Sequence, residues 1–277
     1  MDVLLQIRDE LLDFAGTGVS VMEISHRSQP FMDFAHRTDA AVRRVLAVPT
    51  DYHVLLLQGG SYLQFSQIPM NLLHQANTAD YIHTGLWSEQ AANAAKKYGN
   101  VEIVASSYET GFDRIPEINE SNINRDAAYL HYTENETAQG LQFSKPPVSP
   151  IPLVCDACSS LMSKPIDVSA HDLIYASAQK NMGIAGVTLL LYELIDSSDG
   201  FYINNVLPDY RSINNVPFHI AETDLDIYLL KSEKNGFHGL KGHQSTGGLR
   251  ASIYNAVTLD AVQALGEFMR EFKRTHG

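Results

Sequence analysis

Lys180 stands just after an apolar run, in a segment of small residues between Ser177 and Gly183. Asp156 ends the apolar run that precedes it in the chain. If both runs are strands of one parallel sheet, the two residues lie at the same edge, where ligands of such sheets gather. The lysine amine can condense with the aldehyde of pyridoxal phosphate. A carboxylate beside the ring nitrogen keeps that ring protonated and electron-accepting. The pair therefore predicts pyridoxal phosphate chemistry.

Each member of this pair also has an ordinary explanation. Most lysines are solvated, and the amine becomes reactive only when burial or a neighbouring cation lowers its pKa. Asp156, followed by Ser159 and Ser160, is also a reasonable helix N-cap. The apolar run before Asp156 favours a buried carboxylate with a cationic partner, because an unpaired buried charge is costly.

A glycine pair follows another apolar run and precedes a helix-like segment. Backbone N–H groups at Gly59, Gly60, Ser61 and Tyr62, together with the positive end of a helix, would suit a phosphate group. Without the lysine, an ordinary strand-to-helix connection would be the better interpretation of this turn.

Aromatic and basic residues supply further candidates. Trp87 is the single tryptophan and could stack on a cofactor ring, although one tryptophan is more often a core anchor. Arg27 and Arg250 could each clamp a carboxylate, although a surface ion pair explains either arginine singly. Lys241 and His243 precede Arg250 and form a local positive patch that could hold a phosphorylated substrate.

Composition excludes several classes of protein. A net charge of -12 disfavours a nucleic-acid partner, and no apolar run approaches the roughly 20 residues that a membrane span requires. Two cysteines in 277 residues exclude a disulfide scaffold and suggest the cytoplasm. The pair Cys155 and Cys158 has no second pair to complete a zinc site, so no metal is expected. Residues 1–12 read as a helix and not as a targeting signal.

Short apolar runs alternate with helix-like segments along most of the chain. Strands are expected at residues 54–57, 101–104, 127–130, 152–155, 173–176 and 187–191. Nearly continuous apolar strands separated by helices predict an α/β fold, with helices on both faces of the sheet. Beyond about residue 201 the pattern changes to strands at 216–220 and 248–254 and a closing helix at 258–274. We therefore predict a large domain, residues 1–191, and a small α+β domain, residues 192–277.

Six separated segments, in the same order, resemble the phosphoserine aminotransferase family of class-V aminotransferases. They are residues 20–27, 64–72, 131–137, 163–169, 175–181, and 240–243 together with 247–255. The resemblance implies a fold-type-I, pyridoxal phosphate-dependent transaminase with a mixed, mostly parallel sheet. Transaminases of this family are usually homodimers. It implies transfer of the amino group of glutamate to 3-phosphohydroxypyruvate, giving phosphoserine and 2-oxoglutarate in serine biosynthesis. A phosphorylated hydroxythreonine of the pyridoxine pathway is a further substrate that the resemblance allows.

The resemblance also assigns roles to residues. Lys180 resembles the cofactor-linked lysine, Asp156 the partner of the pyridine nitrogen, and Trp87 the ring-stacking residue. The remaining assignments are cofactor contacts for Thr137 and Gln179, cofactor-phosphate amides for Ser61 and Tyr62, substrate-carboxylate arginines for Arg27 and Arg250, and a substrate-phosphate contact for His243.

The chain departs from the family in three places. It begins at the helix that follows a Phe-Ser-Ser-Gly-Pro type turn. Many dozens of family residues are missing near Leu191, including an Asn-Thr pair that binds the phosphate of the neighbouring subunit's cofactor. Gln244 replaces an arginine common among relatives. The gap is either a deletion or a stretch left out of the sequence; a strand running into a helix without turn residues favours omission.

Three functions remain open at this point. The first is an active aminotransferase whose sequence is incomplete, which an intact mass well above 30.7 kDa would support. The second is a catalytically impaired or cofactor-free homologue retained for binding or assembly. The third is a related transaminase acting on an unphosphorylated keto acid, which substrate profiling would distinguish.

Overall fold

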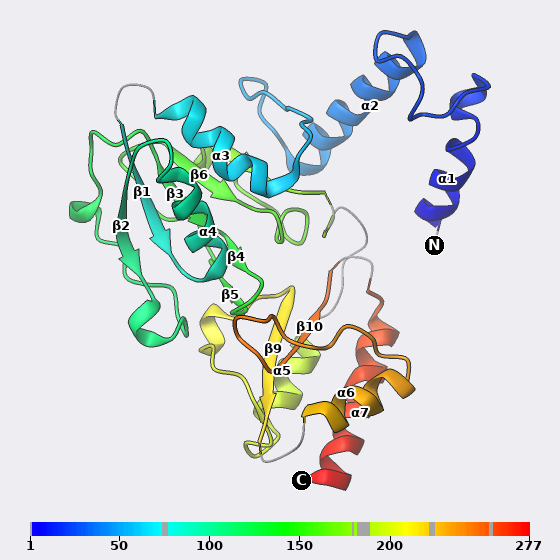
Figure 1. The fold of residues 1–277 in the computed structure, drawn as a ribbon, viewed down its shortest axis with the longest axis vertical. Helices are drawn as coiled ribbons and strands as arrows, with labels where there is room; N and C mark the ends of the chain where they lie inside the picture. The colour runs from blue at the N-terminus through cyan, green and yellow to red at the C-terminus, as the bar shows by residue number, and fades with distance from the viewer. Residues whose placement is uncertain (1, 74–76, 179, 182–188, 222–224, 255–256) are drawn as a thin grey trace. The chain divides into compact units, whose positions relative to one another are not determined.

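A computed structural model describes residues 2–73, 77–178, 180–181, 189–221, 225–254 and 257–277 (Figure 1). The chain divides into two compact units, residues 1–56 and 57–277. None of the helices in the described parts is long and apolar enough to cross a bilayer.

The first unit is helical. Helix α1, Asp2–Glu10, confirms the helix expected at the N-terminus. A 3-10 turn, η1, Phe14–Gly16, follows. Helix α2, Gln29–Leu46, begins with a proline in its first turn and ends at Ala47 in the left-handed conformation. Both are common terminal signals.

The second unit contains a five-stranded sheet in which every neighbouring pair is parallel. Its order is β2-β1-β3-β6-β7. The strands are β1, Thr78–His83; β2, Asn100–Ser106; β3, Leu130–Thr133; β6, Leu153–Asp156; and β7, Leu173–Tyr175. This sheet confirms the predicted α/β class.

Two helices lie over one face of this sheet (Figure 1), namely α3, Gly60–Leu72, and α4, Leu86–Ala95. Their side chains Phe65 and Ala91 pack with Tyr81 and Tyr175 of the sheet in one core cluster. The opposite face forms a second cluster, in which Leu130 and Leu153 pack with Phe143 from a connecting segment. Alternate residues of each strand therefore serve the two cores.

A smaller antiparallel sheet follows, with order β10-β9-β8. Its strands are β8, Tyr202–Ile203; β9, Asn215–Ile220; and β10, Leu249–Ser252, and the helices packed with it are α5, Leu189–Asp196; α6, Leu225–Lys234; and α7, Leu259–His276. The predicted strands at 216–220 and 248–254 and the closing helix are confirmed. The domain boundary at residue 191 stays a prediction.

Short elements connect these parts. The hairpin β4, Asn135–Glu136, with β5, Leu141–Gln142, follows β3 directly. The 3-10 turns are η2, Tyr108–Thr110; η3, Glu120–Asn122; η4, Val168–Ala170; and η5, Pro208–Tyr210. The backbone N–H of Ser212 donates to Gly140 O at 2.6 Å, which joins the hairpin turn to the segment before β9.

Three predicted strands were wrong in whole or in part. Residues 54–57 form no strand, and Leu55, Leu56 and Leu57 are each more than 60% exposed. An apolar run becomes a strand only where a neighbouring strand supplies hydrogen bonds. The run at 127–130 becomes strand only at Leu130.

The third misplaced strand was expected at residues 187–191. Residues 187 and 188 lie outside the described residues, but helix α5 already begins at Leu189. The buried positions Leu191, Leu194 and Ile195 recur at helical spacing and enter the core of the small sheet. Leucine is also a strong helix former, so an apolar run of leucines is a poor strand signal.

Candidate active site

A cavity of about 240 Å³ opens where β3 and β6 end and α3 begins. Such a location, beyond the carboxyl ends of parallel strands, is where α/β sheets bind ligands. The cavity is lined by Gly59, Gly60, Ser61, Tyr62, Phe65, Trp87, Thr133, Asn135, Asp156, Cys158, Ser159, Ser177 and Lys180. The structure thus brings together the predicted acid, the predicted amine, the glycine turn and the tryptophan.

Asp156 ends β6 and is 4% exposed. Its Oδ1 accepts the backbone N–H of Cys158 at 2.9 Å. Burial raises the pKa of Asp156, while hydrogen bonds from Cys158 and the charge of Lys180 act in the opposite direction. The Asp156 carboxylate therefore lies at the wall of the cavity, where a bound cation would stabilise its negative charge.

Lys180 follows β7 by five residues and lies on the same cavity. Burial lowers the pKa of the Lys180 amine, and the nearby groups of Cys158 and Asp156 oppose that shift. A lowered pKa increases the fraction of neutral amine, which is the form that attacks a carbonyl carbon. The local chemistry therefore suits a nucleophilic lysine.

Trp87 lies in the first turn of α4 and contacts residues from several elements. Its Nε1 donates to Thr137 Oγ1 at 2.7 Å, and the Lys180 Nζ lies 5.5 Å from its ring centroid. The rings of Tyr62 and His243 meet it edge to face, at 6.0 and 6.2 Å between centroids. The indole and Thr137 are thus held together as a pair.

Glu136 fixes the start of the helix that carries Trp87. Its carboxyl oxygens accept the backbone N–H groups of Trp87 at 2.9 Å and Ser88 at 2.8 Å. It also bonds the Ser88 hydroxyl at 2.7 Å. These are the unpaired donors of a helix N-terminus, which favours an acidic group. Burial nevertheless raises the pKa of Glu136 to about 7.

The glycine turn has the shape expected of an anion site. Gly59 precedes α3 with φ of 95°, a conformation that glycine adopts without strain. The backbone N–H of Ser61 donates to the hydroxyl of Ser177 at 2.9 Å, and the two hydroxyls lie 2.8 Å apart. Ser177, which the sequence reasoning missed, therefore shares the predicted phosphate site. Its position among small residues before Lys180 was the available signal.

The other predicted site residues differ in their contacts with the residues described above. Arg250, on β10, donates from Nη1 to Thr137 O at 3.1 Å. His243 contacts Trp87; burial, then the charge of Arg250, lowers its pKa. Arg27 is exposed in the first unit, and Gln179 lies outside the described residues.

Two polar residues of the cavity wall were not predicted. Thr133 and Asn135 are each 2% exposed, and Thr133 Oγ1 and Asn135 Oδ1 have no hydrogen-bond partner within the described parts of the chain. The amide nitrogen of Asn135 is occupied, since it donates to Ser159 Oγ at 2.8 Å and to Asn215 Oδ1 at 3.1 Å. Buried polar atoms without protein partners commonly mark ligand contacts.

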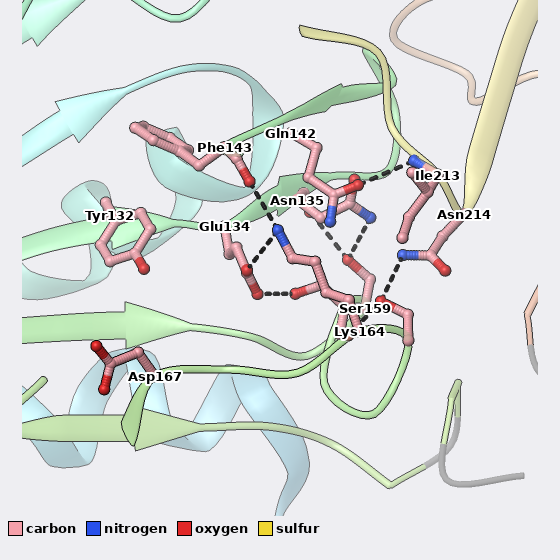
Figure 2. A network of polar contacts seen from close by, with 12 residues as sticks. Tyr132, Glu134, Asn135, Gln142, Phe143, Ser159, Lys164, Asp167, Ile213 and Asn214 are labelled. Atoms are coloured by element: carbon pink, nitrogen blue, oxygen red, sulfur yellow. Dashed lines mark hydrogen bonds and ion pairs between the residues drawn. The ribbon is translucent and has the colours of Figure 1, made fainter. Parts of the chain in front are cut away.

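A partly buried ion pair, in which Glu134 is buried and Lys164 is half-buried, stabilises this wall (Figure 2). Lys164 Nζ lies 3.2 Å from Glu134 Oε1 and donates to Phe143 O at 3.0 Å. The Ser160 hydroxyl donates to the other Glu134 oxygen. The network ties the end of β3 to the loop after Asp156, so two walls of the cavity are held by one salt bridge.

The two cysteines lie at and just after the end of β6. Cys155 and Cys158 are free and buried, and no group of three metal-binding side chains was found within the described residues. Burial raises the pKa of the Cys158 thiol above 9.

The residues of the cavity fit pyridoxal phosphate. A basic ring nitrogen requires an acid, an aldehyde requires an amine, and a phosphate requires clustered N–H groups. Asp156, Lys180 and the N-terminus of α3 provide these groups on one cavity. The unpartnered oxygens of Thr133 and Asn135 add polar contacts for a ligand. The fold and this site define a pyridoxal phosphate-dependent aminotransferase.

Comparisons with known proteins agree. The Aminotransferase class-V family model matches residues 1–193. The chain is 41% identical to the phosphoserine aminotransferase of Acinetobacter baumannii (strain ACICU), across 99% of this chain and 96% of that protein. The chain belongs to the class-V aminotransferase family and, within it, to the phosphoserine aminotransferases.

Solved structures give the same result. The phosphoserine aminotransferase of Bacillus circulans subsp. alkalophilus superposes with a TM-score of 0.93 at 34% identity, covering 100% of this chain and 96% of that one. The pyridoxal phosphate-bound enzyme of Trichomonas vaginalis gives a TM-score of 0.87 at 28% identity, covering 98% and 96%.

The alignment with the Acinetobacter protein spans 344 positions, whereas this chain has 277 residues. At least 67 aligned positions, 344 minus 277, are therefore gaps in this chain. The prediction that many dozens of family residues are missing from the interior agrees with this difference in length.

Proposed function

We propose that this protein transfers the amino group of L-glutamate to 3-phosphohydroxypyruvate, giving phosphoserine and 2-oxoglutarate in serine biosynthesis. The observation that carries the proposal is the shared cavity of Asp156 and Lys180 in a chain that is 41% identical to a phosphoserine aminotransferase. In the second half-reaction, Asp156 and Lys180 act in the reverse direction on the keto acid.

Each residue of the cavity has a task in this reaction. Pyridoxal phosphate, when bound, supplies an electron-accepting ring that makes the Cα proton of the substrate acidic. Asp156 holds a proton on the ring nitrogen. The amine of Lys180, freed by the incoming substrate, takes the Cα proton as general base and returns it as general acid. The lowered pKa of Lys180 suits both the removal and the return of this proton.

Substrate recognition is assigned to the basic residues. Arg250 donates to Thr137, which is hydrogen-bonded to Trp87 of the cavity wall, and would bind the substrate carboxylate, with Arg27 as the second predicted carboxylate ligand. His243, next to Trp87, would contact the substrate phosphate. Gln244 lacks the charge of an arginine, so we expect weaker phosphate binding than an arginine at that position would give.

Replacing the lysine tests the proposal. Lys180→Ala is expected to lose the absorbance of the lysine-bound cofactor and to slow transamination by several orders of magnitude, because no other group moves the Cα proton. Lys97→Ala, at an exposed lysine just after α4, is the matched control. Turnover by Lys180→Ala at the rate of the control would remove the assignment.

Two other functions keep support from particular residues. The gap of at least 67 positions favours an impaired homologue, and a purified protein that binds the cofactor but shows no turnover with any keto acid would support it. Gln244 favours a transaminase for unphosphorylated keto acids. Equal kcat/KM for keto acids with and without phosphate would support that alternative.

We further propose a cytoplasmic homodimer that also accepts a phosphorylated hydroxythreonine of the pyridoxine pathway. The free buried cysteines support a reducing compartment. The exposed leucine run at residues 55–57 supports a homodimer, because contiguous exposed apolar surface is typical of interfaces. The pyridoxine-pathway activity rests on the family resemblance alone.

A further inference from the structure

A buried tyrosine lies directly beside the acid of the cavity. Tyr175, on β7, is the register partner of Asp156 on the neighbouring parallel strand β6, so both side chains project from the same face of the sheet. The tyrosine is 7% exposed, and its interaction with Asp156 is among the effects that lower the pKa of that carboxyl against the larger effect of burial. The Tyr175 hydroxyl is therefore placed to act as a second donor to the aspartate, besides the backbone N–H of Cys158.

A buried histidine continues this contact into the core. His131, on β3 and 2% exposed, places Nε2 at 2.9 Å from the Tyr175 hydroxyl. Its ring stacks on Tyr81 at 4.7 Å between centroids and 23° between planes. A row of polar side chains thus extends from Asp156 at the cavity wall, through Tyr175, to His131, whose imidazole is held in place by the ring of Tyr81.

The direction of each hydrogen bond follows from the charge on Asp156. An ionised carboxylate only accepts, so the Tyr175 hydroxyl donates to it. The tyrosine oxygen then accepts from Nε2–H of His131. Burial lowers the pKa of His131 to about 3, so the ring is neutral and Nδ1 carries no proton. Consistently, Nδ1 has no partner among the described residues.

We propose that His131 and Tyr175 form a hydrogen-bond relay that keeps the Asp156 carboxylate ionised and oriented toward the cofactor ring. Both act as positioning residues, because they reach the cofactor only through Asp156. The proposal rests on the role proposed for Asp156 itself. It gives a function to the buried His131, which lies beside the apolar cluster that contains Tyr81 and Tyr175.

Three variants separate the relay from ordinary core packing. Tyr175→Phe removes only the hydroxyl, His131→Phe removes the donor, and His131→Gln keeps an N–H donor of similar reach. Tyr129→Phe is the matched control. It removes a buried hydroxyl on the same face, whose side-chain hydrogen bond is to Tyr81, at 2.8 Å.

The first measurement is the dissociation constant of pyridoxal phosphate, and the second is the rate of the half-reaction with glutamate. A hydrogen bond to a charged group sets the expected scale, so Tyr175→Phe should weaken binding and slow the half-reaction by roughly ten- to a hundredfold in total. His131→Phe should change both in the same direction, and His131→Gln should recover most of the loss. Tyr129→Phe should alter neither, although it lowers the melting temperature of the apoprotein.

A double-variant cycle decides the outcome. In an Asp156→Asn background, Tyr175→Phe should have little further effect, because the relay has no carboxylate to act on. Losses that simply multiply would overturn the relay, as would a Tyr175→Phe protein that matches Tyr129→Phe. If Asp156→Asn alone changes neither measurement, the proposed role of Asp156 fails instead.

Discussion

Burial shifts the pKa values of the two central residues of the site in opposite directions. Burial raises the pKa of Asp156 and lowers the pKa of Lys180, so the charged form of each group is less stable in the cavity than in water. A ligand with a basic ring nitrogen and an aldehyde relieves both, because it gives the acid a cation and the amine a carbon to attack. This is the physical reason for assigning the two roles as we do.

Glu136 gives a prediction that depends on pH. Burial raises the pKa of this carboxyl from its ordinary value of 4.5 to about 7, so the folded state binds this proton more tightly than the unfolded chain does. The stabilisation is complete below pH 4.5 and is lost as pH rises through about 7. The free energy of unfolding of the wild type, relative to Glu136→Gln, should therefore fall by about 3 kcal/mol across that window.

Urea unfolding of both proteins at several pH values between 4 and 8 measures this difference. Both proteins contain His131, so subtracting their free energies of unfolding cancels the contribution of that residue. The lowered pKa of His131 would otherwise make the free energy of unfolding rise with pH in part of the same pH range. A difference that stays flat with pH would mean that Glu136 is already ionised at its normal pKa, and that the cap of α4 is a carboxylate throughout.

At the scale of elements, the ends of β3 and β6 are joined by the Glu134–Lys164 pair (Figure 2). Lys164→Met should destabilise the protein by about 2 to 3 kcal/mol, because it leaves Glu134 buried without its cation. The double variant Glu134→Gln with Lys164→Met should recover most of this loss. Equal stability of the single and double variants, measured by urea unfolding, would contradict a buried pair.

Several elements could be predicted from the sequence because their patterns were strong. The apolar runs near Val101, Leu153 and Leu173 are strands buried in a parallel sheet, as expected. Strand β1 was missed because its sequence contains polar residues. One of them, Asp80, is fully buried and accepts the backbone N–H of Asn124 at 2.7 Å, a contact that no local pattern reveals.

The candidate site was predictable to a similar extent. Lys180 and Asp156 were found because each follows an apolar run, and the cavity contains both. Ser177, Thr133 and Asn135 were missed because small polar residues occur in every loop. Their importance depends on cross-strand distances and on atoms left without partners, which only the folded chain defines.

At the scale of the second unit, polar contacts join the cavity to the small sheet. Asn135 donates to Asn215, whose own amide nitrogen donates to Tyr254 at 3.1 Å. Arg250 reaches Thr137 from β10. Asn135 of the cavity wall and the nearby Thr137 are therefore hydrogen-bonded to strands of the small sheet.

The proposed homodimer gives a prediction for the whole molecule. Light scattering during gel filtration should report twice the intact mass of one chain at micromolar concentration. Leu56→Asp, within the exposed leucine run, should shift the protein toward the monomer, because an interface rejects an unpaired charge. A wild-type mass equal to the intact mass of a single chain at the same concentration would contradict the homodimer.

The most direct test of the whole account is to identify the amine that carries the cofactor. The protein is loaded with pyridoxal phosphate and reduced with borohydride, which fixes the cofactor to the nitrogen that holds it. The protein is then digested, and its peptides are sequenced by mass spectrometry. We predict a single stoichiometric label on Lys180. A label on another lysine, or none after loading, would contradict the central claim.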